Sequence, residues 1–497
     1  MDRDGKFFGQ LILLVLFACF MFPSLLYKSF VPAASPGNDP GIGSSRTRRS
    51  VELETNKSTR PSSSPPAQNC VKSSIHNFPD DFMSQHQRKK GGVLIHVLLA
   101  VYLFSALAIV CEDFFVPSLE QIAEKLKISY EVAGAALMPI GTSTPDLIFS
   151  IVGVLIATSD LGEAAIVGSA VFNNLFVVAI CGLFAGSTLR LSRWPLLRVS
   201  LCYLVSIAAL IAVTYDQKVY WYEALGLVCI FSLYIVILYF DTALEGFFHR
   251  LLKIRKENAD TEINSEELIL LPLRQVPQQD VQIIDQNNNS PFSFPQGFIS
   301  RVTWIIVLPV KCLLYMTTPD CRKESWRKWY LASFSISLVW IALLSYALVW
   351  MTSIIGFTLG ISDVILGLTF LAAGGSATDL LSSLAVARQG YGDMAVSNAI
   401  GCNVCNILLG LGLPWLLKTT FVDFGGHVDV QSGSMSYTSI CLLGTVFVSL
   451  FCVVLNRWVL NKCLGIVFLV LYLTFIVVAI LFGLNVFGDF NLPTCQT

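Results

Sequence analysis

Charged residues are scarce in this chain. They make up 13% of its 497 residues, against roughly a quarter in soluble domains, whereas 54% of the residues are apolar. Several apolar windows of membrane-spanning length exclude a soluble globular protein. The formal net charge is −1, so the composition does not indicate a nucleic-acid-binding protein. The sequence also lacks a nucleotide-binding loop, a cluster of metal-binding histidines and a nucleophile triad, so it predicts neither an enzyme nor a bound cofactor.

The cysteines do not read as a disulfide framework. Half of the 14 lie inside apolar segments, where a cysteine more often serves as a small packing residue. These are Cys181, Cys202, Cys229, Cys402, Cys405, Cys441 and Cys452.

One pattern occurs twice in the chain, 233 residues apart and inside apolar segments. Gly141–Leu147 (GTSTPDL) recurs as Gly374–Leu380 (GGSATDL), so that Asp146 matches Asp379. Ten of the 35 positions from 141 to 175 are identical in the second copy, where unrelated sequence would give roughly two. A duplicated membrane element with a carboxylate in each copy is typical of a repeat-built transporter.

The N-terminal part reads as a leader followed by a polar arm. Residues 1–30 hold an apolar run followed by proline and small residues, which favours a cleaved signal peptide over a retained helix. Residues 31–92 are rich in Ser, Pro and Arg, and such a composition does not fold by itself. The triplet that begins at Asn56 is a glycosylation acceptor if the arm lies outside the cell.

Ten membrane-spanning helices are predicted after the arm. The first half covers 93–240 and the second 330–485, with a polar loop at 241–329 between them and a tail at 486–497. The predicted spans are 93–115, 132–157, 163–186, 196–215, 219–240, 330–351, 361–387, 392–417, 437–456 and 464–485, and the repeats cover 132–186 and 361–417. Because five is odd, the second half enters the membrane inverted. The predicted fold class is therefore an all-α multi-pass membrane protein of two inverted five-helix repeats.

Basic residues in the short loops indicate one topology. The loop with Arg190 and Arg193 has no acidic residue, so we expect it in the cytoplasm together with the middle loop. Asp160 then lies outside and its repeat partner Asp393 inside. Within the middle loop, 304–316 is apolar but interrupted by proline and lysine, which favours a surface helix or partial hairpin over a span.

Two cysteines beyond the leader, Cys70 and Cys495, fall on the outer side in this topology. That side is oxidising, so we predict a disulfide between them that ties the arm to the tail. Two independent thiols are the alternative.

Polar side chains surround the first repeated aspartate. Thr142, Ser143 and Asp146 lie about one helical turn apart, so their oxygens can share one side. Pro145 is expected to break this helix and to release backbone carbonyls as further ligands. Hydroxyls at such spacing are also common packing residues in membrane helices, and that alternative stays open.

The following segment adds a hydroxyl and an amide. Ser169 and Asn173 are four residues apart, and Asn173 has a repeat partner in Asn406. Oxygen ligands without a His or Cys cluster predict a hard-cation site, suited to Ca²⁺ or Na⁺. Asp146 and Asp379 supply two negative charges, enough to neutralise one Ca²⁺. The two asparagines could instead join helices by hydrogen bonds.

These residues resemble the two alpha-repeats of the sodium/calcium exchanger superfamily. The likeness is carried by Gly141–Asp146 with Gly168–Asn173, and by Gly367–Asp379 with Gly392–Pro414. The strings VYWYE at 219–223 and TTPDCRK at 317–323 resemble its potassium-dependent branch, solute carrier family 24. The resemblance implies the sodium/calcium exchanger fold, alternating access and ion sites near the bilayer centre. It implies metal ligation by Asp146, Asp379, Asn173, Asn406, Thr142, Ser143, Ser169 and Ser376.

Five positions depart from the family pattern. Asp146 stands where Glu is usual, and Asn406 where the potassium-dependent branch usually carries Asp. The predicted ligands together form a cage around the ion, and this cage therefore holds only two negative charges. That charge count disfavours K⁺ co-transport. Gly375, Thr378 and Cys402 replace a usual Thr, Pro and Ser, and these changes weaken hydroxyl ligation of Na⁺ in the second repeat.

Together these features predict a secondary antiporter that exchanges Ca²⁺ for Na⁺, with K⁺ left open as a third substrate. The alternatives are a transport-poor, degenerate exchanger with a regulatory role, and an exchanger that uses H⁺ or Li⁺. A leader and a glycosylation acceptor place the protein in the secretory system, with the plasma membrane as the default and an intracellular secretory or organellar membrane as the alternative. The sequence gives no indication of oligomeric state.

Overall fold

The structure is a computed structural model that describes residues 74–125, 138–186, 188–240, 298–323, 326–430, 433–484 and 486. The leader, most of the arm, most of the middle loop and the tail lie outside the described residues. The predictions for Asn56, Cys70 and Cys495 fall on these parts and stay predictions.

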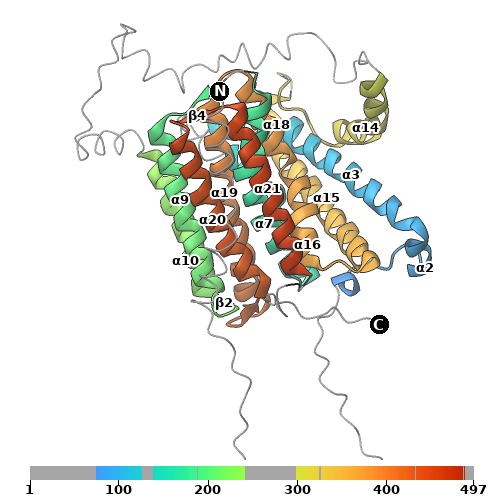
Figure 1. The fold of residues 1–497 in the computed structure, drawn as a ribbon. Coiled ribbons are helices and arrows are strands. Elements are labelled where there is room, and N and C mark those ends of the chain that lie inside the picture. The colour runs from blue at the N-terminus through green and yellow to red at the C-terminus, as the bar shows by residue number, and fades with distance from the viewer. Residues whose placement is uncertain are drawn as a thin grey trace, which may run out of the picture.

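Long apolar helices make up the described part of the chain (Figure 1). Nine of the helices there are long and apolar enough to cross a membrane, and a bent pair raises the number to ten. The helices of the first half are α3 (Val93–Val110), α4 (Val116–Lys125), α6 (Met138–Val152), α7 (Leu161–Val171), α8 (Val178–Phe184), α9 (Arg193–Thr214) and α10 (Trp221–Tyr239). Those of the second half are α15 (Tyr330–Leu359), α16 (Asp363–Leu366), α17 (Ala372–Gly375), α18 (Ala377–Arg388), α19 (Gly392–Leu417), α20 (Gly433–Leu455) and α21 (Lys462–Gly483).

Wide π-helical turns connect several of these helices. They are η2 (Arg88–Gly92), η3 (Cys111–Phe115), η5 (Gly153–Ala157), η6 (Phe172–Val177), η8 (Gly367–Leu371) and η9 (Lys418–Val422). Such turns are often found at functional sites in membrane and soluble proteins alike. Here η6 contains Asn173, and η8 leads into the helix break before Asp379.

The first spanning helix continues past its predicted end at 115. There η3 leads without a break into α4, although Pro117 follows directly. Pro117 has no N–H to donate to the carbonyl of Asp113, four residues earlier. Arg322 supplies the missing donor, because its guanidinium bonds the Asp113 carbonyl at 2.6 Å and the Asp113 carboxylate at 2.8 Å. A residue about 200 positions away thus stabilises the extension.

The helix α14 (Phe298–Thr317) lies beside one end of α3 (Figure 1). Pro309 falls inside it, and its apolar stretch Trp304–Thr317 is shorter than a membrane span. This agrees with the prediction that the segment does not span the membrane, and its position as a surface helix or partial hairpin stays a prediction.

Two short ribbons join the halves, and each pairs the loop between the third and fourth spans of one half with the loop between the fourth and fifth spans of the other. The strand β1 (Leu189–Arg190) pairs antiparallel with β4 (Val459–Leu460), and β2 (Lys218–Tyr220) pairs antiparallel with β3 (His427–Asp429). Figure 1 places β4 and β2 at opposite ends of the bundle. The loops that the charge pattern assigned to one side of the membrane therefore meet at one end.

The two halves cross at the centre, where α7 packs on η8. The two backbones come close because Gly168 faces the Leu368 carbonyl and Gly367 faces the Leu161 carbonyl. A side chain at either glycine would meet the opposite backbone. Small residues allow such contacts between membrane helices. The helices α7 and α19 are largely buried, and α9 and α10 expose more of their apolar surface.

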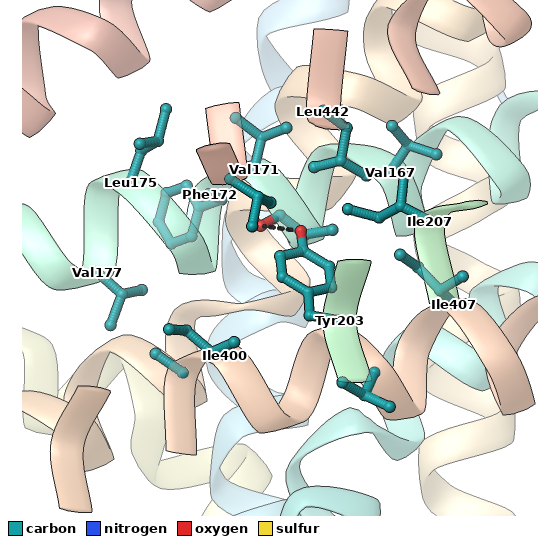
Figure 2. Packing of buried hydrophobic residues seen from close by; sticks show 14 of the residues in the cluster. Val167, Val171, Phe172, Leu175, Val177, Tyr203, Ile207, Ile400, Ile407 and Leu442 are labelled. Carbon is teal, nitrogen blue, oxygen red and sulfur yellow. Dashed lines mark hydrogen bonds between the residues drawn. The ribbon is translucent and has the colours of Figure 1, made fainter. Parts of the chain in front are cut away.

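Figure 2 shows the apolar packing beside this crossing. The ring of Tyr203 is fully buried in α9, and its hydroxyl donates to the carbonyl of Ala170 at 3.3 Å. Aliphatic side chains from both halves surround it, among them Val167, Val171, Ile400 and Leu442. The polar backbone group at the centre is therefore satisfied within an apolar cluster.

Candidate functional site

The helix α6 carries Thr142, Ser143 and Asp146 without the predicted break. It is continuous from Met138 to Val152 with Pro145 inside, so the prediction of a break was wrong. Pro145 still leaves the carbonyl of Gly141 without its usual helical donor. Neighbouring threonine hydroxyls bond adjacent carbonyls, as in Thr144 to Ile140 at 2.7 Å, and such bonds help proline fit within membrane helices.

The equivalent segment of the second repeat is the one that breaks, although it has no proline. The helices α17 and α18 meet at Ser376 with a bend of 44°. The dipeptide Gly374–Gly375 precedes the bend, and kinks are common at such glycine and serine positions. The Ser376 hydroxyl is fully buried and has no hydrogen-bond partner among the described residues.

Each aspartate is held by the asparagine of the opposite repeat. Asn406 in α19 donates from Nδ2 to Asp146 Oδ2 at 2.8 Å. Asn173 in η6 donates from Nδ2 to Asp379 Oδ2 at 2.9 Å. All four side chains are buried. The structure therefore brings together the two repeated aspartates and the two repeated asparagines, in a crosswise arrangement.

The remaining partners of the two carboxylates differ. Asp379 Oδ1 accepts from the Cys402 thiol at 3.6 Å, and the Thr142 hydroxyl lies 3.4 Å from the sulfur of that thiol. Asp146 Oδ1 has no partner among the described residues, and the nearby Ser169 hydroxyl donates to the Ala372 carbonyl at 3.5 Å. Both carboxylate oxygens of Asp379 thus accept hydrogen bonds, whereas one carboxylate oxygen of Asp146 accepts none from the described residues.

Gly375 lies directly against the free side of Asp146. A Cβ atom at this glycine would collide with Asp146 Oδ1 and lie 3.0 Å from the Phe149 ring. Its repeat partner in the first half is Thr142, whose hydroxyl lies 3.4 Å from the Cys402 sulfur beside Asp379. The departure at Gly375 therefore removes a hydroxyl and also makes room for the carboxylate.

Several buried oxygens around the aspartates lack a donor. In the described part of the chain these include Asp146 Oδ1, Asn173 Oδ1, Asn406 Oδ1 and Ser376 Oγ. Neither carboxylate has a Lys, Arg or His partner there. Buried acceptors without donors are costly unless a cation satisfies them. No group of three His, Cys, Asp or Glu side chains in these ranges could hold a metal, so a bound ion would depend on amide and hydroxyl oxygens as well.

Ser143 is buried, and its hydroxyl has no hydrogen-bond partner among the described residues. Sequence reasoning also missed two polar contacts. Glu163 accepts from the Trp415 indole at 2.7 Å, and no motif indicated this pair. Asn403 donates to the Ala170 carbonyl at 3.0 Å; its position as the repeat partner of Ala170 was the available signal.

A family model described as sodium/calcium exchanger protein matches residues 96–240 and 329–481. The human protein sodium/potassium/calcium exchanger 3 is 37% identical over 86% of this chain and 87% of its own length. Human sodium/potassium/calcium exchanger 5 is 36% identical over 86% of this chain and 91% of its own. A solved structure of the sodium-calcium exchanger NCX_Mj is 22% identical, covers 77% of this chain and 97% of its own, and superposes with a TM-score of 0.42.

Proposed function

The chain belongs to the sodium/calcium exchanger family, and we propose that it is a secondary antiporter that exchanges Ca²⁺ for Na⁺ across a membrane. The observation that carries this proposal is the crosswise arrangement of two buried aspartates. Each accepts a hydrogen bond from an asparagine of the opposite repeat, and neither has a basic partner in the described residues. Two uncompensated carboxylates inside a membrane protein point to a cation pathway.

The ligand chemistry favours hard cations. Ca²⁺ takes six to eight oxygen ligands from carboxylates, amides, carbonyls and hydroxyls. We propose Asp146 and Asp379 as the charged ligands, and the oxygens of Asn173, Asn406 and Ser376 as neutral ligands. Two negative charges neutralise one Ca²⁺, and Na⁺ competes for the same oxygens. No covalent chemistry is required, because the ions exchange as the two repeats move around the cage.

The charge count favours exchange without obligatory K⁺. The relatives named above are called sodium/potassium/calcium exchangers. In this chain the position beside Asp146 is Asn406, which brings a neutral amide that donates to the carboxylate. A cage with two negative charges is already neutral with one Ca²⁺ and has no charge left for a monovalent ion. We therefore propose that K⁺ is dispensable.

A second function is favoured by the altered residues of the second repeat. Gly375 and Thr378 supply no ligating hydroxyl to the aspartates in the described hydrogen bonds, and Cys402 places sulfur beside Asp379. A poorly transporting protein with a regulatory role would tolerate such changes. Retention of both aspartates favours the antiporter.

For location we propose the plasma membrane, supported by the leader-like N-terminus and the acceptor at Asn56.

Uptake of radiolabelled Ca²⁺ into vesicles that contain the full-length protein tests the proposal. We expect uptake to require an outward Na⁺ gradient and to persist when K⁺ is omitted. Replacement of internal Na⁺ by Li⁺, or by a proton gradient, separates the exchangers that use other ions. Absence of uptake under every gradient, with the protein correctly inserted, would favour the regulatory function.

A further inference from the structure

A cysteine thiol stands among the oxygens of the Asp379 side. Cys402 in α19 is fully buried. Its sulfur lies 3.6 Å from Asp379 Oδ1 and 3.4 Å from Thr142 Oγ1, and Asn398 Oδ1 lies 4.0 Å away. Two of these three neighbours are groups that the sequence predicted as cation ligands. The thiol is therefore part of the cage wall and not of the apolar packing.

The equivalent position on the other side of the cage holds a hydroxyl. Ser169 is the repeat partner of Cys402, and its hydroxyl donates to the Ala372 carbonyl at 3.5 Å. The Asp146 side thus presents oxygen atoms, whereas the Asp379 side presents oxygen and sulfur. The groups around Asp146 and around Asp379 are therefore two half-sites of the cage with different chemistry. The difference arises because Cys402 replaces the usual serine.

Sulfur and oxygen ligands select different cations. Thiolates bind soft and borderline ions such as Zn²⁺ far better than they bind Ca²⁺ or Na⁺. Cd²⁺ joins this preference for sulfur to a size close to that of Ca²⁺. The sulfur binds as a thiolate, so its proton leaves to solvent when the metal enters.

We propose that the Asp379 half-site, formed by Cys402, Asp379 and Thr142, binds a thiophilic divalent cation of the Cd²⁺ class and that this ion blocks Ca²⁺ exchange. The proposal rests on the proposed function for the identity of the cage. The carboxylate supplies charge, and the thiolate supplies most of the selectivity. The Thr142 hydroxyl completes the group, whose three side chains come from α18, α19 and α6. Because this group joins both repeats, a tightly held ion also opposes their relative movement.

Inhibition of vesicle uptake by Cd²⁺ tests the block. With inhibition expressed relative to the uptake of each variant without Cd²⁺, we expect Cys402→Ser to require at least about tenfold more Cd²⁺ for half-inhibition, as loss of a contact at a metal site typically does. Cys181→Ala is the matched control, since Cys181 is equally buried but packs in the apolar cluster. Equal Cd²⁺ sensitivity in the wild type and Cys402→Ser would overturn the proposal.

Direct binding separates this proposal from the transport function. The purified full-length protein, with the exposed residues Cys229 and Cys463 replaced by alanine, is loaded with Cd²⁺ and measured by X-ray absorption at the Cd edge. We expect a sulfur neighbour that disappears in Cys402→Ser, persists in Cys181→Ala, and is lost when excess Ca²⁺ competes. A sulfur neighbour that survives Cys402→Ser would refute the site even if Ca²⁺ exchange were demonstrated. Conversely, the expected spectra would support the site in a protein that does not transport.

Discussion

Asn403 donates a hydrogen bond of 3.0 Å from Nδ2 to the carbonyl of Ala170, and the two residues are repeat partners 233 positions apart. Equivalent points of two symmetric units can touch only near the axis that relates them. The pseudo-twofold axis of the protein therefore passes between α7 and α19 at this contact. The Tyr203 hydroxyl donates to the same carbonyl, so the axis is fixed by a buried polar group with two donors (Figure 2). Asp146 and Asp379 then occupy equivalent positions about this axis.

Neutralisation of either aspartate should abolish Na⁺-driven Ca²⁺ uptake. Asp146→Asn and Asp379→Asn keep the side-chain shape and an oxygen that accepts from Asn406 or Asn173. Each removes half of the negative charge of the cage, and a divalent cation would then carry a net charge in a buried site. We expect uptake to fall to background in vesicle assays with matched protein levels.

The exposed residue Asp216 provides the control for these variants. It lies in the turn before β2, where it accepts from the backbone N–H of Lys218, and Asp216→Asn should leave uptake unchanged. Full uptake in both cage variants would reject the antiporter mechanism.

The repeat made much of the architecture predictable from the sequence. An offset of 233 residues with a carboxylate in each copy predicted two inverted halves, and the apolar segments gave ten spans close to the helices of the structure. The helix that ends at Lys125 was predicted too short, because the donor that compensates Pro117 is Arg322. Local sequence cannot reveal a partner so far along the chain.

The aspartates and asparagines were also predictable, but their pairing was not. Spacing along one helix places Ser169 near Asn173, yet it does not tell which asparagine meets which aspartate. That depends on how the halves interlock at Gly168 and Gly367. The break expected at Pro145 was wrong for a similar reason, since hydroxyls and packing keep α6 continuous while the bend falls at Ser376. The ligand roles themselves remain predictions.

Gly375→Ala should disturb the Asp146 side specifically. The added methyl group would collide with Asp146 Oδ1 and press on the Phe149 ring. Overpacking of this kind typically costs about 1–3 kcal/mol, and here the displaced group is a proposed ligand. We expect a lower melting temperature in detergent and a severe loss of Ca²⁺ uptake.

Gly226→Ala is the matched control for this substitution. Gly226 lies within the helix α10, and a Cβ there meets no atom within 4 Å. Alanine is favoured over glycine in helices by about 0.5–1 kcal/mol, so stability should stay equal or rise. Equal melting temperatures and equal Ca²⁺ uptake in Gly375→Ala and Gly226→Ala would show that Gly375 does not lie in close contact with Asp146.

Asn406→Asp should make exchange depend on K⁺. The substitution replaces an amide donor, 2.8 Å from Asp146 Oδ2, with a second carboxylate. Like charges so close together cannot both stay ionised unless a further cation lies between them. We expect K⁺ to raise the apparent Ca²⁺ affinity of the variant by about fivefold or more, within the usual range of coupling between ligands.

A K⁺ titration of Ca²⁺ uptake measures this effect. Asn174→Asp is the control, because Asn174 is buried next to Asn173 but accepts from Ser449 through an oxygen that aspartate would keep. A titration curve that Asn406→Asp leaves unchanged would count against the charge argument for K⁺.

Gly168 and its repeat partner Gly401 should tolerate a methyl group unequally. A Cβ at Gly168 would collide with the Leu368 carbonyl and lie 2.6 Å from Ala372 Cβ, whereas, among the residues that the structure describes, the atom nearest to a Cβ at Gly401 is Tyr234 Oη at 3.6 Å. Gly168→Ala must therefore separate α7 from η8, at a cost of at least about 2 kcal/mol. Gly401→Ala makes an ordinary contact and should fold normally.

Size-exclusion profiles of the two detergent-solubilised variants after stepwise heating compare their stabilities directly. Equal stability of the pair would mean that the halves do not meet backbone to backbone at this point, and the crosswise placement of the two aspartates that depends on it would have to be revised.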